Sequence, residues 1–155
     1  MSDSELRGLR RGADYQFGSG AGAALFPDAS AVEVTHTSSG RPRQVHADDG
    51  RLATYATDGR FVLGLAGGRR LRDSFDDPAH RVVVGDESEP FVREGRNTFA
   101  KFVQQADPDI RPGDETLVVH ENGDLLAVGR AELPGDGMAD FETGMAVKVR
   151  QGTDS

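Results

Sequence analysis

The sequence contains no cysteine, and only two of its 155 residues are lysine. Without cysteine the chain can form neither a disulfide bond nor a thiolate site for zinc. It also lacks a run of about 18 apolar residues, which a membrane-spanning helix requires. The polar start, residues 1–16, has no apolar centre of the kind found in secretory signals. We therefore expect a cytoplasmic protein without a membrane partner.

Positive charge is scarce and is carried almost entirely by arginine. The chain has 18 basic residues against 26 acidic ones, a formal net charge of -8. An acidic, lysine-poor composition is typical of proteins adapted to high salt, and it predicts a halophilic source. Residues 81–155 hold eight basic and fifteen acidic groups, a balance of -7. This balance counts against a generic nucleic-acid binder but leaves room for a local basic face, since salt screens distant charges.

Hydrophobic periodicity predicts an α+β fold of two small domains, residues 1–79 and 80–153. The first domain begins with a helix that Ser2 or Ser4 could cap, followed by a glycine-rich turn and a second short helix. From Ala31 apolar and polar residues alternate, and turn signals separate about four strands. A helix at 66–75 follows. We expect a meander sheet with short helices, an α/β arrangement.

The second domain is expected to be a small closed β-barrel with two brief helices. Asn122-Gly123 is a strong hairpin turn between two of its strands. In the last strand, alternation places Met145, Val147 and Val149 on one face and the intervening residues on the other. The expected strands are 81–84, 99–105, 115–121, 125–133 and 145–150, and the expected helices are 90–95 and 138–141.

No group of residues suited to catalysis or metal binding stands out. The four histidines are scattered, and no serine has the sequence context of a nucleophile. The acidic pairs at 48–49 and 76–77 stand beside glycine or proline, where Asp forms turns. The glycines at 18–22 favour a turn between helices over a phosphate-binding loop, because their spacing matches no phosphate-binding motif. We expect no catalytic residue, no metal and no cofactor.

Two stretches are informative as motifs: residues 95–133, which begin GRNTFAKFV, and residues 141–152, FETGMAVKVRQG. Both resemble PUA domains, which are small RNA-binding β-barrels. Upstream, ADYQFGSGAGAALFPD, GRFVLGLAGGRRL and RVVVGDESEPFVREG resemble the domain that precedes the PUA domain in archaeal archaeosine tRNA-guanine transglycosylases. The resemblance covers about residues 9–152. The catalytic barrel of those enzymes has no counterpart here, so we expect no transglycosylase activity.

This resemblance implies a protein that binds tRNA at the acceptor stem and the unpaired 3′ end. We expect a stand-alone RNA-binding module or an adaptor that presents tRNA to a modification enzyme. Glycine lets the backbone approach a ligand closely, and Arg and Lys can bind phosphates. The expected RNA-binding residues are Gly95, Arg96, Asn97, Phe99, Ala100, Lys101, Lys148 and Arg150.

Several alternatives remain open at this point. Period two places Phe99 and Phe102 on opposite faces of a strand, and we slightly favour Phe102 for the core and Phe99 for stacking on a base. The arginines at 69, 70 and 72 either extend a phosphate-binding track or form a solvated helix face. The acidic second half favours another function, a protein-interaction or assembly module that no longer binds RNA. The role of the first domain and the existence of a homodimer are undecided.

Overall fold

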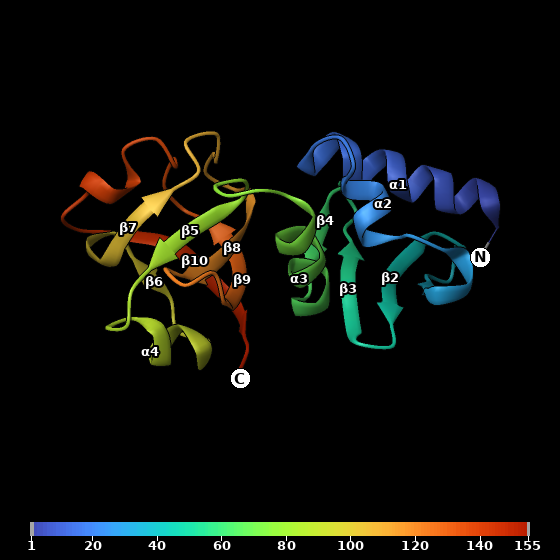
Figure 1. Cartoon of the computed structure of the whole chain (residues 1–155). Coiled ribbons are helices and arrows are strands. Elements are labelled where there is room, and N and C mark those ends of the chain that lie inside the picture. The colour runs from blue at the N-terminus through green and yellow to red at the C-terminus, as the bar shows by residue number, and fades with distance from the viewer. Residues whose placement is uncertain (1, 155) are drawn as a thin grey trace. The chain divides into compact units, whose positions relative to one another are not determined.

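The structure, a computed structural model, describes residues 2–154 (Figure 1). The chain divides into two compact units, of which the first ends at Ser74 and the second begins at Phe75. Each unit has a β-sheet of its own. In the part of the chain that the structure describes, no helix combines the length and the apolar character needed to cross a membrane.

The first unit is a four-stranded antiparallel meander, which confirms the prediction for this half. The sheet order is β1-β2-β3-β4, so each strand pairs with the next one along the chain. Its strands are β1 (Glu33–His36), β2 (Pro42–Ala47), β3 (Gly50–Tyr55) and β4 (Phe61–Leu63). Its helices are α1 (Asp3–Phe17), α2 (Ala21–Leu25) and α3 (Leu65–Ser74), with the 3-10 turn η1 (Ala29–Ala31) between α2 and β1.

The amphipathic helix α1 supplies much of the core of this unit. Ser2 caps it by accepting a hydrogen bond from the Glu5 backbone N–H at 3.1 Å. Its apolar positions recur at helical spacing and are buried: Leu6, Leu9, Ala13 and Phe17. Gly22 of α2 permits a close crossing, because a Cβ atom there would lie 2.3 Å from the Arg10 carbonyl oxygen. The glycine-rich segment is therefore a turn between two packed helices.

The second unit is a nearly closed, mixed six-stranded barrel. Its strands are β5 (Arg81–Val84), β6 (Thr98–Phe99), β7 (Val103–Ala106), β8 (Glu115–His120), β9 (Leu125–Ala131) and β10 (Met145–Gly152). Its helical segments are α4 (Glu89–Arg93), η2 (Ala100–Phe102) and η3 (Met138–Asp140). Strands β5 and β8 are parallel, and all other pairs are antiparallel.

Sheet order explains how this barrel approaches closure. The order is β6-β10-β9-β8-β5-β7, so β6 and β7 are the two outer strands. These strands are neighbours in sequence, joined only by the three residues of η2. The short connection holds the two sheet edges near each other around one apolar core. That core includes Val82, Val118, Leu126 and Val147, each with no exposed surface.

The structure corrects two details of the sequence-based strand assignments in this unit. Residues 99–105 were expected to form one strand, but η2 interrupts it, so period two does not apply between Phe99 and Phe102. In β10, Ala146 and Val147 are both buried, although alternation placed them on opposite faces. The pairing of β10 with β6 shifts register between Met145 and Val147, and this irregularity breaks the alternation.

Candidate nucleic-acid interface

A tight helix end organises the candidate site. Helix α4 ends at Arg93, and Gly95 follows with a φ of 100°, in the left-handed region that favours glycine. The Gly95 N–H donates to the Val92 carbonyl at 2.9 Å, and the Arg96 N–H donates to the Phe91 carbonyl at 3.0 Å. These two bonds form a Schellman motif. The motif turns the chain back, so that the Arg96 guanidinium lies 5.6 Å from the centre of the Phe91 ring.

The segment after Gly95 lies beside the last strand, β10. The Asn97 side-chain oxygen accepts a hydrogen bond from the Val149 N–H at 3.0 Å. One residue later, Thr98 pairs with Val147 across β6 and β10. Asn97 therefore has a structural task, because it holds the loop after α4 against the strand that carries Lys148. Two segments about fifty residues apart in sequence become neighbours in this way.

An apolar groove opens between α4, β6 and η2. Its volume is about 240 Å³. Phe91 and Phe99, which both line the groove, are 51% and 46% exposed. The lining residues are Glu87, Ser88, Phe91, Val92, Arg96, Asn97, Thr98, Phe99 and Phe102. Aromatic faces at the surface of a groove are suited to stacking against a flat ligand such as an unpaired base.

Thr98 adds a polar group to this apolar groove. The residue is 1% exposed, and its hydroxyl has no hydrogen-bond partner among the described residues. A buried hydroxyl without a partner costs free energy, about 1–3 kcal/mol in mutational data.

The cationic residues near the groove differ in how they are engaged. Lys101 is exposed, with its ammonium 5.0 Å from the centre of the Phe102 ring. Lys148 is exposed on β10, and neither lysine forms an ion pair within residues 2–154. The Arg96 guanidinium lies 3.8 Å from a Glu94 carboxylate oxygen, with both side chains largely in solvent. Such exposed pairs contribute little, so Arg96 is available to a ligand.

Two expected site residues have structural roles instead. Arg150 forms a two-pronged ion pair with Glu115, whose side chain is only 8% exposed. Its charge is thus compensated within the protein. Ala100 is fully buried in the barrel core, and its N–H already donates to the Gly144 carbonyl. Both residues thus make contacts within the protein, and alternation alone could not reveal the acidic partner of Arg150.

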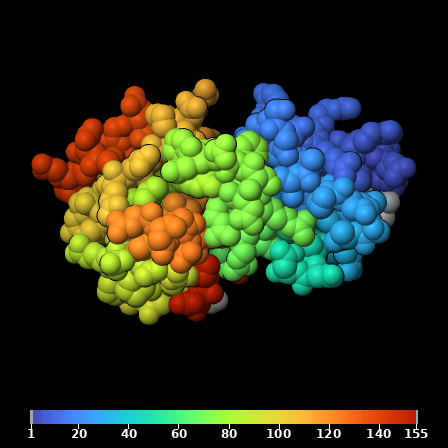
Figure 2. Space-filling model, viewed as in Figure 1, coloured from blue at the N-terminus to red at the C-terminus, as the bar shows by residue number. Residues whose placement is uncertain are grey.

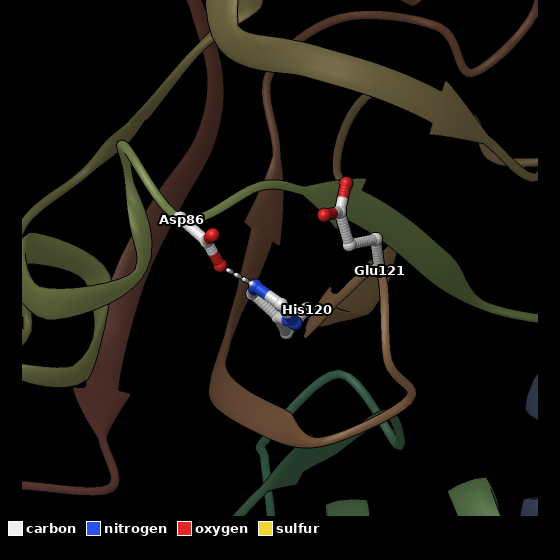
Figure 3. Close-up of side chains that lie close together, drawn as sticks. All are labelled: Asp86, His120 and Glu121. Atoms are coloured by element: carbon white, nitrogen blue, oxygen red, sulfur yellow. Dashed lines mark hydrogen bonds and ion pairs between the residues drawn. The ribbon is translucent and has the colours of Figure 1, made fainter.

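A second cluster, which the sequence did not suggest, joins Asp86, His120 and Glu121 (Figure 3). His120 Nε2 lies 2.6 Å from a carboxylate oxygen of Asp86, 34 residues earlier. This hydrogen bond raises the pKa of His120 above its ordinary value of 6.5. In the space-filling view the turn at 121–124 lies against residues 86–94 (Figure 2). The bond therefore fastens the β8–β9 turn to the loop after β5.

The hydrogen bonds of His120 do not suit a metal ligand. The Asn122 backbone N–H donates to His120 Nδ1 at 3.1 Å, so in the neutral ring Nε2 carries the proton and donates to Asp86. A metal at Nε2 would have to displace this proton and the hydrogen bond to Asp86. We therefore interpret the cluster as a structural hydrogen-bond network.

Comparison with known proteins gives a domain match for each half of the chain. Residues 7–78 match the patch-forming domain C2 of tRNA-guanine transglycosylase, and residues 80–153 match the PUA domain. The chain is 52% identical over 143 residues to tRNA-guanine(15) transglycosylase of Pyrococcus furiosus, covering 92% of this chain and 24% of that protein. It is 45% identical over 149 residues to that of Methanothermobacter thermautotrophicus, covering 96% and 23%. The chain thus spans about a quarter of the length of these relatives.

Solved structures share the fold at lower identity. A hypothetical protein from Pyrococcus horikoshii superposes with a TM-score of 0.75 at 24% identity, covering 98% of this chain and 92% of that one. A conserved PUA domain protein from Thermoplasma acidophilum gives a TM-score of 0.64 at 21% identity, covering 98% and 91%. These two structures show a shared fold. The domain matches identify the chain as a C2 domain of tRNA-guanine transglycosylase followed by a PUA domain.

Proposed function

We propose that the protein binds structured RNA, and tRNA in particular, as an RNA-binding module in tRNA modification. The observation that carries the proposal is the groove beside Gly95, in which Phe91 and Phe99 are exposed. The Lys101 ammonium lies 5.0 Å from the ring of Phe102, which also lines the groove, and has no acidic partner in the described chain. The relatives named above are tRNA-guanine transglycosylases, which supports a tRNA substrate. The chain corresponds to about a quarter of their length, and we propose that this part binds RNA rather than exchanges bases.

The binding mechanism combines charge with stacking. Lys101, Lys148 and Arg96 would contact phosphates, since their cationic groups are exposed. Phe99 and Phe91 would stack on a base that is not paired. Unpaired bases and duplex ends expose base faces for stacking. We therefore propose that the groove contacts the acceptor stem and the 3′ end of tRNA. Gly95 permits close approach of the backbone beside the groove.

A double substitution of the two lysines tests this function. Lys101→Ala with Lys148→Ala should weaken the binding of a transcribed tRNA and lower the slope of log affinity against log salt by about two. The matched control is Arg111→Ala, which removes an exposed positive charge from the turn before β8. Unchanged tRNA affinity in the double variant would refute the proposed site.

Stacking is tested separately from charge. Phe99→Ala should lower the affinity by roughly 1–3 kcal/mol, with little change in the salt slope because no charge is lost. Removing the unpaired 3′ end from the tRNA should weaken its binding to the wild-type protein. The Phe99→Ala variant should bind the truncated and the intact tRNA about equally. Equal loss in both proteins would mean that Phe99 does not contact the 3′ end.

One observation favours a second candidate, an interaction module for another protein. Residues 81–155 have a net charge of -7, which repels nucleic acid at long range. In that case the aromatic groove would receive an apolar side chain of an enzyme subunit involved in tRNA modification. Absence of tRNA binding at low salt by the folded wild-type protein would favour this candidate.

A further inference from the structure

The outer face of α1 in the first unit has features that its own fold does not use. Ser4, Gly8, Arg11 and Tyr15 follow one another at spacings of four, three and four residues, which places them along one side of the helix. Arg7 lies one turn before Arg11 on the same side. All five are exposed, and they lie opposite the buried Leu and Phe positions. We call these five residues the α1 face.

Neither arginine of this face has a partner within the described chain. Arg7 and Arg11 form no hydrogen bond or ion pair with any described residue. Like charges four residues apart on a helix repel each other, so this arrangement is mildly destabilising. By contrast, Arg10 on the inner side donates to the Phe26 and Pro27 carbonyls at 2.7 and 2.6 Å. The arginines of the α1 face are therefore not explained by folding.

The acidic residues of the same helix are occupied elsewhere. A Glu5 carboxylate oxygen lies 3.0 Å from His36 Nε2 on β1, and the Asp14 carboxylate accepts from the Gly22 N–H at 2.7 Å. Asp3, one turn before Arg7, forms no ion pair with it. On the α1 face itself, Arg7 and Arg11 are the charged residues, and neither is held by an acidic group of the described chain.

The presence of a glycine at position 8, in the middle of the helix, is an independent observation on the same face. A glycine in the middle of a helix lowers its stability relative to alanine. At Gly12 of the same helix a packing reason exists, because a Cβ atom would lie 3.3 Å from the Phe61 ring. At Gly8 nothing lies within 4 Å of such a Cβ atom. Packing within this unit thus gives no reason for Gly8, whereas close approach of another molecule does.

Ser4 and Gly8 also border a hollow of about 430 Å³ between α1, β2 and β3. Tyr55 and Pro42 form its opposite wall. Glu5 is the acidic residue among those that line it, and its carboxylate is held by His36. Hydroxyl groups of serine and tyrosine are common donors to phosphate and sugar oxygens. The dark-blue α1 segment forms part of the outer surface of its unit (Figure 2).

We propose that the α1 face binds the sugar–phosphate backbone of an RNA strand. Arg7 and Arg11 lie about 6 Å apart along the helix axis, and they contact phosphates. Gly8 allows the backbone of the strand to approach the helix, and Ser4 donates to it. Tyr15, which is 94% exposed, stacks on a base or ribose at the end of the face. This surface is separate from the PUA groove and extends RNA recognition to the first unit.

Substitutions in the full chain test this proposal, with a fluorescein-labelled tRNA transcript as the probe. Arg7→Ala and Arg11→Ala should each weaken binding by about tenfold and lower the salt slope by about one. Arg43→Ala is the matched control, because it removes an exposed arginine of β2 that has no partner among the described residues. It should leave both values unchanged. Tyr15→Ala should weaken binding by about tenfold without changing the salt slope.

Gly8→Ala separates binding from folding. If Gly8 serves RNA approach, the added methyl group should raise the thermal midpoint and weaken tRNA binding at the same time. A variant that is more stable and binds as tightly as the wild type would overturn the role of Gly8. Equal affinity and salt slope in the wild type and the Arg7→Ala, Arg11→Ala double variant would overturn the whole proposal.

The proposals for the two RNA-binding surfaces can be refuted independently of each other. Loss of binding only on substitution of Lys101 and Lys148 would leave the PUA groove as the RNA site and reject the α1 face. Loss only on substitution of Arg7 and Arg11 would do the reverse. Poly-L-glutamate bound through the α1 face as tightly as tRNA would also reject RNA as its ligand, in favour of an acidic protein.

Discussion

Arg150→Ala should destabilise the PUA unit rather than act mainly on RNA binding. The substitution leaves the Glu115 carboxylate, 8% exposed, without its cationic partner. Removing one member of a fully buried pair costs about 3–5 kcal/mol. The Arg150 side chain is 32% exposed, so we expect a smaller loss of about 2 kcal/mol. For a unit of this size such a loss lowers the unfolding midpoint by roughly 10 °C.

Urea unfolding followed by circular dichroism measures this effect, since the chain contains no tryptophan. The double variant Glu115→Gln, Arg150→Met should recover more than half of the lost stability, because no unpaired charge remains in the barrel. The tRNA affinity of Arg150→Ala, measured well below its unfolding transition, should stay near the wild-type value. Wild-type stability together with a large loss of tRNA affinity would refute the structural role of Arg150.

Two further predictions concern solution conditions. The hydrogen bond to Asp86 raises the pKa of His120 above 6.5. The stabilising contribution of this bond is therefore complete below about pH 6.5 and is lost as pH rises through the higher pKa of the folded state. The free energy of unfolding, measured against pH, should show this decline, and Asp86→Asn should flatten the pH dependence. If Asp86→Asn leaves the slope unchanged, the bond is not its source. Raising KCl from about 0.1 to about 1 M should raise the thermal midpoint of unfolding, because screening weakens repulsion among acidic groups in a chain of net charge -8. The same increase in KCl should weaken tRNA binding. A thermal midpoint that falls with KCl would contradict this explanation.

Local signals in the sequence were sufficient for most of the architecture. Alternating residues from Ala31 onward predicted the meander, and Ser2 was one of the two candidates for the cap of the first helix. The helix end at Gly95 followed from the conformational freedom of glycine. Each of these features depends on residues within a few positions of one another, and for that reason a single sequence reveals them.

Features that depend on distant residues were not predictable in the same way. The interruption of the strand at η2 arises because the chain must connect the two outer strands of the barrel within three residues. The pairs Arg150–Glu115 and His120–Asp86 join positions 35 and 34 residues apart. Their formation depends on which strands become neighbours, and periodicity does not carry that information.

By itself, the sequence determined the order of most helices and strands, the acidic charge and the scarcity of lysine, because composition and short-range periodicity specify them. Only the tertiary structure decided which cations remain available to a ligand. Arg150 is neutralised by a buried carboxylate, whereas Lys101 and Lys148, like Arg7 and Arg11 on α1, have no acidic partner in the described chain. The physical reason is that an ion pair requires two groups within a few ångströms, and packing brings such groups together from distant parts of the sequence.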